Sequence, residues 1–313
     1  MYKSAKIGVI VPAYNEEKLI GKVIETIPEF VDRIIVVDDA STDNTGDIVK
    51  GYQNNQENRL FLIQHDKNQG VGGAIVSGYK QVLNEGLDIA VVMAGDGQMD
   101  PNDLMKLIEP VATGNVDYTK GNRLLTGNAW QIIPKIRYLG NSLLSLLTKI
   151  ASGYWHVVDS QSGYTATTSN VLKMLNLDKI YKRYGMPNDM LVKLNIYNFK
   201  VKDIPVNPIY NIGEKSGIKV WTTIFTLSFL LFKLFWYRLF QKYIIRDFHP
   251  LIFFYLMAFT LLPAGISLGI AIVVVKGYIS LTILMFCVLL LISGFQALFF
   301  AMWFDMEYNK ELR

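Results

Sequence analysis

Short apolar runs alternate with helical patterns along the chain up to about residue 215. The runs have the length and the valine and isoleucine content of buried strands; they are Lys6–Val11, Arg33–Val37, Leu60–Gln64 and Ile89–Met93. The segments between them carry apolar residues at helical spacing; these are Glu17–Glu29, Asp43–Gln53 and Val71–Leu83. The alternation predicts an α/β domain with a parallel sheet covered by helices on both faces. Ligands of such sheets bind at the carboxyl ends of the strands, so the loops that follow these strands are the candidate site.

Beyond residue 250 the pattern changes to continuous apolar sequence. Leu251–Val275 and Gly277–Phe304 contain no charged side chain. Each run is longer than the roughly 20 apolar residues that a helix needs to cross a bilayer core, which excludes a purely soluble protein. We therefore expect transmembrane helices over about 251–275 and 279–304. The few residues around Lys276–Tyr278 that join them force a hairpin.

A basic, aromatic-rich segment, residues 220–248, precedes the first apolar run. Arg238, Lys242 and Arg246 are spaced by four and so share one helical face. This pattern is typical of an amphipathic helix that lies in the membrane interface. A helix packed on the preceding domain is the alternative. The basic residues before the first span place both chain ends in the cytoplasm by the positive-inside rule.

These patterns divide the chain into four expected parts. We expect a cytoplasmic domain over 1–219, the interfacial segment over 220–248, the hairpin over 249–305 and a cytoplasmic tail over 306–313. The single cysteine, Cys287, lies in the second apolar run, which excludes a disulfide framework and a cysteine-ligated zinc site. A net charge of +4 is too small to indicate a nucleic-acid partner.

The loops after the first two strands carry acids and an aromatic residue. In Pro12–Glu16, a proline ends the strand, and Tyr14 and Glu16 have the chemistry to clamp a flat base; a plain helix start is the alternative. The neighbouring carboxylates of Asp38 and Asp39 repel each other unless a cation or a hydrogen-bond donor joins them. Helix capping explains Asp43 better than it explains these two acids.

The loops after the third and fourth strands suggest phosphate and metal chemistry. Asn68–Ala74 opens a helix with three glycines, which allows either close approach of a phosphate or a tight contact between the helix and the sheet. In Met93–Pro101, Asp96 and the amide oxygen of Gln98 alternate on an exposed turn. These oxygens suit a divalent ion, Mg²⁺ or Mn²⁺, although an Asp-Gly pair can also be simply a turn.

Two arginines follow in a lightly charged stretch. Arg123 closes a predicted fifth strand, and Arg137 lies one helical turn from Asn141 in the helix that comes next. Arginines beside a candidate metal loop suggest binding of anionic oxygens, with ordinary surface arginines as the alternative. Residues 187–206 have the pattern of one more helix and strand.

Taken together, these five loops resemble the type-A-fold glycosyltransferases of family two, and within them the dolichyl-phosphate mannose synthase-like group of polyprenyl-phosphate glycosyltransferases. The resemblance covers roughly residues 5–220. It implies a Rossmann-like nucleotide-diphospho-sugar transferase domain. The two-span tail is similar to that of bacterial and archaeal members of the group.

The resemblance implies a role for each matching position. Residues expected to hold the base and ribose are Pro12, Tyr14, Glu16 and Asp39. Asp96 and Gln98 match the turn that holds the metal and the diphosphate. Residues expected to grip the acceptor phosphate and the donor diphosphate are Arg123, Arg137 and Asn141. Gln161 and Ser162 fall in Asp159–Tyr164, which matches the segment that lines the sugar pocket.

Further positions match less closely. Lys215–Lys219 fall in the loop that closes over the nucleotide, and Lys215 or Lys219 would replace an arginine expected near Asn211. Asp189 aligns near the acid that acts as base towards hydroxyl acceptors, although capping of the next helix is an equally good reading. Ala94 stands where an aspartate usually begins the metal turn, which should weaken metal binding or alter its coordination.

The resemblance thus implies an inverting, metal-dependent sugar transfer to a polyprenyl phosphate at the cytoplasmic membrane face, in cell-envelope or protein glycosylation. UDP is favoured weakly over GDP as the donor nucleotide, and the short hairpin makes a homo-oligomer plausible. One alternative is a polysaccharide synthase, although the chain lacks its Gln-x-x-Arg-Trp motif. The other is a non-catalytic membrane partner of the same fold, suggested by Ala94.

Overall fold

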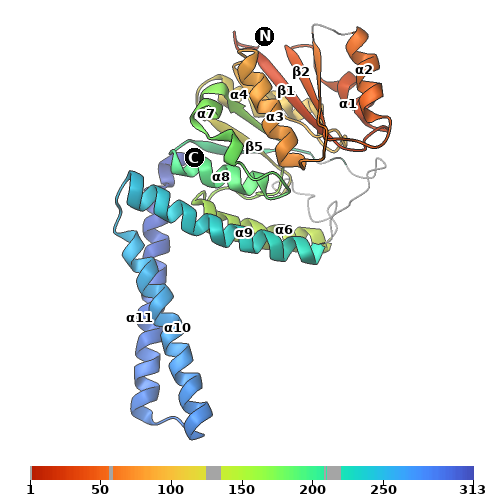
Figure 1. Ribbon diagram of the computed structural model, residues 1–313. Coiled ribbons are helices and arrows are strands. Elements are labelled where there is room, and N and C mark those ends of the chain that lie inside the picture. The colour runs from red at the N-terminus through yellow and green to blue at the C-terminus, as the bar shows by residue number, and fades with distance from the viewer. Residues whose placement is uncertain (1, 56–58, 125–134, 208, 210–219) are drawn as a thin grey trace. The chain divides into compact units, whose positions relative to one another are not determined.

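The computed structural model of the chain describes residues 2–55, 59–124, 135–207, 209 and 220–313 (Figure 1). At residues 55, 135–139, 141 and 220–223 it describes the backbone alone. The described chain divides into a first unit, Met1–Phe235 with Leu312–Arg313, and a second unit, Trp236–Glu311.

The first unit is built on a mixed sheet. Within the described residues the sheet has seven strands in the order β3-β2-β1-β4-β6-β5-β7. The strands are β1 (Ile7–Ala13), β2 (Arg33–Asp38), β3 (Leu60–Gln64), β4 (Ile89–Val92), β5 (Tyr118–Asn122), β6 (Thr165–Thr168) and β7 (Val201–Pro205). The first four strands pair in parallel, as do β5 and β7, but β6 runs antiparallel to both β4 and β5. The parallel pairing predicted for the first four strands is therefore confirmed, whereas β6, which was not predicted, makes the sheet mixed.

The four predicted strands and the three predicted helices between them are confirmed, with shifted ends. The helices are α1 (Ile20–Thr26), α2 (Thr45–Asn55), α3 (Val71–Asn84), α4 (Leu104–Ala112), α6 (Lys135–Ser152), α7 (Ser169–Met174) and α8 (Met186–Ile196). The predicted helix over Glu17–Glu29 is longer than α1. It ends early because Ile27, which precedes Pro28, has extended backbone angles. Short 3-10 turns are η1 (Pro101–Asp103), η2 (Leu177–Lys179) and η4 (Lys310–Leu312).

Apolar side chains fill a core on each face of the sheet, and Figure 1 shows helices on both faces. Val9 and Val11 of β1 face the core that α1 and α4 cover, whereas Ile10 faces the core under α3 and α8. Both faces of β1 are therefore buried, which explains its uninterrupted apolar sequence. Leu312, near the end of the chain, is also buried in the second of these cores.

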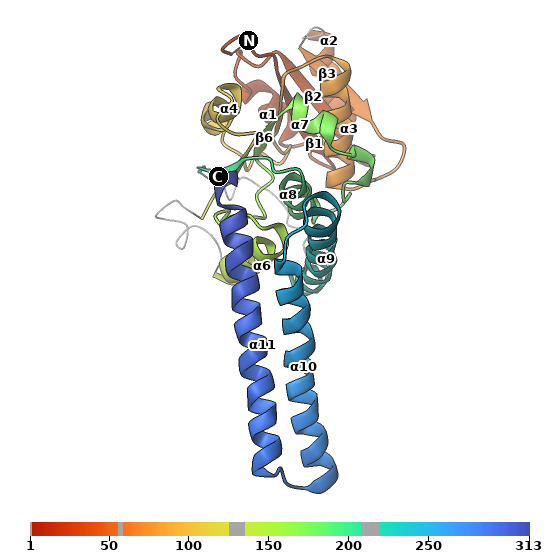
Figure 2. The ribbon, with the colours of Figure 1, turned by 90° about the vertical axis from the view of Figure 1, so that its left-hand side faces the viewer.

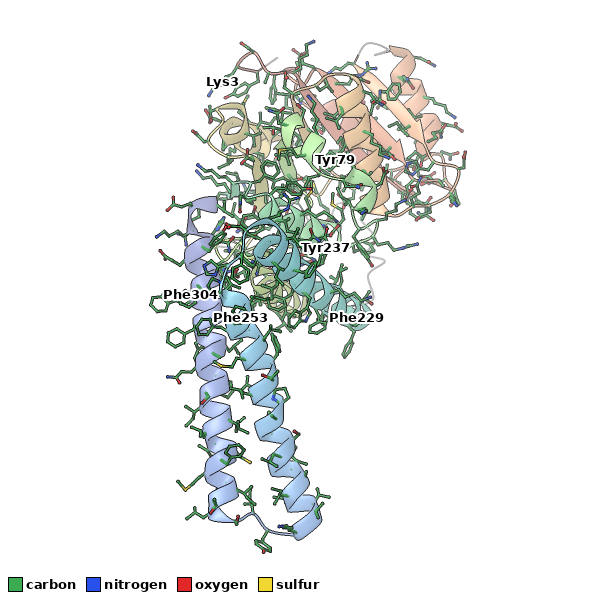
Figure 3. The ribbon with its side chains drawn as sticks, turned by 60° about the vertical axis from the view of Figure 1, so that its left-hand side comes forward. Lys3, Tyr79, Phe229, Tyr237, Phe253 and Phe304 are labelled. Atoms are coloured by element: carbon green, nitrogen blue, oxygen red, sulfur yellow. The ribbon has the colours of Figure 1, made fainter. Side chains whose placement is uncertain are left out.

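Helix α9 (Val220–Phe240) begins in the first unit. There Leu234 packs on Val192 and Ile196 of α8. Large aromatic side chains on the same helix remain exposed, and Figure 3 shows Phe229 projecting from it. The ammonium of Lys233 lies 4.4 Å from the centre of the Phe229 ring.

The second unit is a helical hairpin of α10 (Leu251–Lys276) and α11 (Leu281–Tyr308), which lie side by side in Figures 1 and 2. Gly294 allows a close approach of Leu262, as small residues do between membrane helices. Phe253 and Phe304 project outward (Figure 3). Among the described residues, three helices are long and apolar enough to cross a membrane: Ile224–Arg246, Leu251–Lys276 and Leu281–Tyr308. The last two coincide with the predicted hairpin, and the first overlaps the predicted interfacial segment.

Two of the basic residues predicted to share one helical face are buried in the second unit. Arg238 donates to both carboxylate oxygens of Asp305, at 2.7 and 2.9 Å. Lys242, in the π-helical turn η3 (Gln241–Arg246), donates to the Oδ1 atom of Asn309 at 2.7 Å. The spacing of these cations therefore reflects packing against α11, whereas Arg246 is exposed.

Candidate functional site

A cavity of about 780 Å³ lies in the first unit, at the carboxyl ends of the parallel strands. This volume is in the range of ligand pockets for small molecules and cofactors. Its wall includes the predicted residues Pro12, Tyr14, Glu16, Asp39 and Asp96. It also includes Asn68 of the predicted glycine-rich loop, and Arg183 and Tyr184, to which the sequence interpretation gave no binding role.

The loops after β1 and β2 are fastened to each other by side-chain hydrogen bonds. Asn15 has a left-handed backbone with φ of 58°, and its Oδ1 atom accepts from the backbone N–H of Thr42 at 2.8 Å. The backbone N–H of Glu16 donates to Thr45 Oγ1 at 2.8 Å. These contacts fix the loop that carries Tyr14 and Glu16 before any ligand enters.

Hydrogen-bond donors, as expected, join the paired acids after β2. Asp38 accepts from the backbone N–H of Ser41 and from the Gln64 amide. Asp39 accepts from His65 Nδ1 at 2.7 Å, and from the backbone N–H groups of Gln69 at 2.8 Å and Gly70 at 2.7 Å. Asp39 therefore ties the β2 loop to the start of α3 while it lines the cavity.

The glycines at the start of α3 are explained by a tight packing contact. Gly70 has a φ of 86°, and the Lys182 carbonyl oxygen lies 2.6 Å from the position that a Cβ atom there would take. The backbone N–H of Gly73 donates to the same carbonyl at 3.2 Å. Of the two interpretations of these glycines, approach of a phosphate or a tight packing contact, the structure shows the contact. It is made with the loop at Lys182 and not with the sheet.

The cavity wall is acidic. Partial burial, followed by the charges of Asp96 and Asp43, raises the pKa of Glu16 to about 7. Among the described residues the acidic side chains in the wall are Glu16, Glu17, Asp39, Asp43 and Asp96, against the basic Lys18 and Arg183. A diphosphate in this cavity would need a cation beside it.

The turn after β4 has oxygens that fit a divalent ion. Asp96 Oδ1 accepts from the backbone N–H of Gln98 at 3.0 Å, and Gly97 takes the left-handed φ of 71° that the turn requires. The part of the chain that the structure describes contains no group of three or more His, Cys, Asp or Glu residues arranged to hold a metal. One carboxylate with an amide oxygen nevertheless suits Mg²⁺, which uses few protein ligands and completes its shell with phosphate and water.

A smaller cavity of about 40 Å³ adjoins this turn. Its wall brings together four of the predicted residues, which are Asp96, Gln98, Arg123 and Ser162. Asp96 lines both cavities. The two cavities therefore meet at the predicted metal turn.

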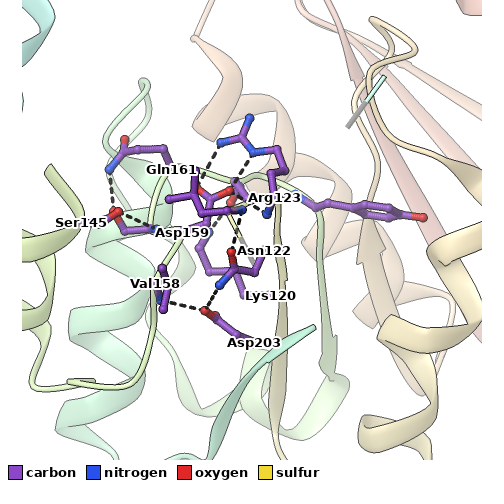
Figure 4. Close-up of polar contacts among 12 residues, drawn as sticks. Lys120, Asn122, Arg123, Ser145, Val158, Asp159, Gln161 and Asp203 are labelled. Carbon is purple, nitrogen blue, oxygen red and sulfur yellow. Dashed lines mark hydrogen bonds and ion pairs between the residues drawn. The ribbon is translucent and has the colours of Figure 1, made fainter. Parts of the chain in front are cut away.

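Arg123 is held by a buried carboxylate (Figure 4). Its Nε and Nη2 atoms donate to Asp159 at 2.7 and 3.1 Å, and its backbone N–H donates to the same side chain at 3.1 Å. Burial alone would raise the pKa of Asp159, but the Arg123 guanidinium holds it below its usual value. The pair fixes the guanidinium at the edge of the small cavity.

A fully buried lysine supports the same wall from β5 (Figure 4). Lys120 donates to the carbonyl oxygen of Ser162. Burial lowers the pKa of Lys120 to about 8, against the opposing effect of Asp159 and Asp203. Asp203, whose own pKa is raised by burial, accepts from the amide of Asn122 at 2.5 Å.

Gln161 and Asp189 do not line either of these two cavities in the described part of the chain. The Gln161 amide donates to Ser160 Oγ at 2.8 Å and to Asn188 Oδ1 at 3.2 Å. Asp189, in the first turn of α8, accepts from the backbone N–H of Tyr181 at 2.7 Å and from the Lys193 ammonium. These contacts give Asp189 a structural role in holding the preceding loop, but it is not the helix cap of the alternative interpretation, because the N-cap of α8 is Gly185.

The remaining predicted residues are described in part or not at all. Arg137 and Asn141 lie one turn apart on α6, as predicted, but their side chains are outside the described residues. Lys215 and the rest of the predicted closing loop are also outside the described residues.

A mixed sheet of this order, with a cavity at the ends of its parallel strands, is the type-A fold of nucleotide-sugar transferases. The model of glycosyl transferase family 2 matches residues 8–173, and the chain belongs to this family.

Relatives and a solved structure agree with this assignment. The chain is 36% identical over 216 residues to the UDP-N-acetylglucosamine–dolichyl-phosphate N-acetylglucosaminyltransferase of Methanococcus voltae, covering 65% of this chain and 86% of that protein. It is 30% identical over 206 residues to the undecaprenyl-phosphate mannosyltransferase of Micrococcus luteus, covering 64% and 82%. Glucosyl-3-phosphoglycerate synthase of Mycobacterium tuberculosis, solved with Mn²⁺ and UDP, has a TM-score of 0.54 at 18% identity, covering 75% and 80%.

Proposed function

We propose that this glycosyltransferase moves a sugar from a nucleotide-diphosphate donor to a polyprenyl phosphate, such as dolichyl or undecaprenyl phosphate. The observation that carries the proposal is the wall shared by the two cavities at Asp96. A donor whose nucleotide fills the large cavity would place its sugar at the turn of Asp96 and Gln98. The acceptors in the names of the two relatives support the acceptor class.

The acceptor is a phosphate oxyanion that is ionised near neutral pH, so it needs positioning more than deprotonation. Arg123 lines the small cavity and is held rigid by Asp159. We propose that Arg123, with Arg137 and Asn141 from α6, orients this oxyanion in line with the anomeric carbon. Attack from the side opposite the departing diphosphate inverts the configuration at that carbon.

Asp96 and Gln98 would hold Mg²⁺ or Mn²⁺, which when bound supplies positive charge for the departing diphosphate. The acidic wall of the large cavity favours the entry of a cation, since Asp96 lies near enough to Glu16 for its charge to raise the Glu16 pKa. Ala94 contributes no oxygen ligand from its side chain. We therefore expect metal binding to be weaker than in relatives with an aspartate at that position.

We propose that α10 and α11 are the two membrane spans, with both chain ends and the catalytic domain in the cytoplasm. The basic residues before α10 support this orientation. The exposed aromatic side chains of α9 support an interfacial position for segment 220–248. UDP is weakly favoured over GDP, and a homo-oligomer is plausible because the hairpin alone buries little surface.

The test is a transfer assay on the full-length chain in detergent, with Mg²⁺ or Mn²⁺, a panel of radiolabelled UDP- and GDP-sugars, and a polyprenyl phosphate. We expect label in the lipid fraction, with the product anomer opposite to that of the donor. Donor binding without turnover would favour the non-catalytic partner. Label in a water-soluble polymer would favour the polysaccharide synthase.

A matched pair of variants locates the activity in the site. Asp96→Asn should lower transfer about 100-fold, because it removes the carboxylate from the proposed metal turn. Asp66→Asn is the control, since Asp66 is an exposed acid on a neighbouring loop that lines neither cavity. Equal activity of the two variants would contradict the proposed site.

A further inference from the structure

The loop Tyr181–Gly185, which precedes α8, forms part of the wall of the large cavity. Arg183 and Tyr184 line this cavity, and Tyr184 is 58% exposed. Within the described residues, neither side chain forms a hydrogen bond or an ion pair. Both are therefore available to a ligand.

The backbone of this loop is anchored on both sides. Asp189 accepts from the backbone N–H of Tyr181 at 2.7 Å, and the Lys193 ammonium donates to the carbonyl of Lys179 at 2.8 Å. On the other side, the Lys182 carbonyl accepts from the Gly73 N–H at 3.2 Å. A loop held in this way presents its side chains to the cavity at little further entropic cost.

The loop lies away from the predicted metal turn. The Cγ atom of Arg183 is 3.2 Å from the place that a Cβ atom of Gly70 would take, and Gly70 donates to Asp39, which follows β2. Asp96 follows β4, and β1 separates β2 from β4 in the sheet. Two strand spacings amount to about 10 Å, so the part of the cavity beside Asp39 and Gly70 is separate from the predicted metal turn.

We propose that Arg183 and Tyr184 form the nucleoside subsite of the donor and select its base. This inference rests on the proposed function. The Tyr184 ring packs on the face of the base, and the planar Arg183 guanidinium donates to carbonyl oxygens on its edge. Uracil and guanine carry a carbonyl where cytosine and adenine carry an amino group, so the subsite favours UDP or GDP over CDP and ADP.

Titration calorimetry on the full-length chain in detergent tests the subsite, with UDP, GDP, CDP, ADP, UMP and GMP as probes. Wild type should bind UDP or GDP about 10-fold more tightly than CDP and ADP. Arg183→Ala should weaken the binding of the preferred diphosphate and of its monophosphate by the same factor, about 10-fold. It should also remove the preference for UDP or GDP over CDP and ADP. Lys182→Ala is the matched control, because the exposed Lys182 side chain does not line the cavity.

The results separate the subsite from the proposed function. Wild type that binds none of the diphosphates overturns both. If wild type binds a diphosphate and Arg183→Ala binds it with the same affinity, only the proposed subsite is overturned. A loss of affinity for the diphosphate without a loss for the monophosphate would also overturn the subsite, because it would show that Arg183 binds a phosphate and not the base.

Variants of Tyr184 give a second, independent test of the subsite. Tyr184→Phe keeps the ring and should bind as wild type, whereas Tyr184→Ala should bind both the diphosphate and the monophosphate roughly 10-fold more weakly. Because Tyr184 is exposed, neither change should move the thermal midpoint of the chain. Wild-type affinity of Tyr184→Ala would exclude stacking on this ring.

Discussion

Arg123 is held at the small cavity by the charge of a buried carboxylate, that of Asp159. Asp159 is fully buried, and its charge, followed by that of Asp203, opposes the lowering of the Lys120 pKa by burial. Removing this charge would break the Arg123–Asp159 ion pair and would leave Lys120 with less compensation from nearby acids. The pair should therefore matter for folding as well as for activity.

We expect Asp159→Asn to lower the free energy of unfolding by about 3 kcal/mol, since one member of a buried ion pair is left alone. Transfer activity should fall with it, because Arg123 loses its fixed position. Chemical denaturation followed by tryptophan fluorescence measures the free energy of unfolding. The control is Glu109→Gln, which removes the exposed Lys3–Glu109 pair and should cost less than about 1 kcal/mol. Equal losses in the two variants would show that the Arg123 pair has no special role.

The raised pKa of Glu16 makes stability depend on pH. Folding raises the pKa from 4.5 to about 7, so between these values the folded chain binds a proton that the unfolded chain does not. The contribution of Glu16 to stability is therefore fully present below pH 4.5 and is lost as the pH rises towards 7.

Glu16→Gln should flatten this pH dependence, whereas Glu29→Gln, at an exposed position outside the cavity, should keep it. Thermal midpoints of the metal-free protein at a series of pH values between 4.5 and 7 measure the slope. A wild-type midpoint that rises over this interval, with no change in slope for Glu16→Gln, would contradict the raised pKa.

The sequence predicted the cavity residues that directly follow strands, because that position is readable from an apolar run. Tyr14 and Asp39 are of this kind, and Asp96 lies in the short turn after β4. Arg183 and Tyr184 come instead from a loop that precedes a helix. Their place in the cavity depends on the long-range contact with Gly70, which no local pattern encodes.

At the scale of elements, the prediction succeeded where burial on both faces produced long valine and isoleucine runs. It failed at β6, whose sequence is Thr-Ala-Thr-Thr. Four residues with three threonines give no apolar run, so the antiparallel direction was not predicted. The strand is fixed by its pairing with β4 and β5, which is tertiary information.

Helix α8 shows how one element can serve the site from a distance. Its first turn carries Asp189, which holds the Tyr181 end of the loop that presents Arg183 to the cavity. If Asp189 is a positioning residue, its loss should loosen the nucleotide site without affecting proton transfer.

We therefore expect Asp189→Ala to raise the KM for the nucleotide sugar about 10-fold while kcat changes little. Asp189→Asn keeps an oxygen acceptor for the Tyr181 N–H and should recover most of the affinity. Steady-state kinetics with the lipid acceptor at saturation distinguish the two parameters. A kcat loss of 100-fold or more, unaltered in Asp189→Asn, would instead support the general-base reading.

At the scale of the whole molecule, charge asymmetry predicts where the chain ends lie. Basic residues precede α10, and the joint of the hairpin carries Lys276 alone. In a Cys287→Ser background, single cysteines at Lys3 and Arg313 should react with an impermeant thiol reagent only after cells are opened. A cysteine at Tyr278 should react from outside. Labelling of Lys3 and Arg313 from opposite sides would exclude this topology.

The burial of Leu312 also bears on how many times the chain crosses the membrane, independently of charge. The chain leaves the catalytic domain through α9 and returns to it at Leu312, which packs in that domain's own core. A path that starts and finishes in one folded body must traverse a closed barrier an even number of times. If α10 and α11 are the two spans, as proposed above, they already make an even number, and α9 does not cross the membrane despite its length and apolar composition.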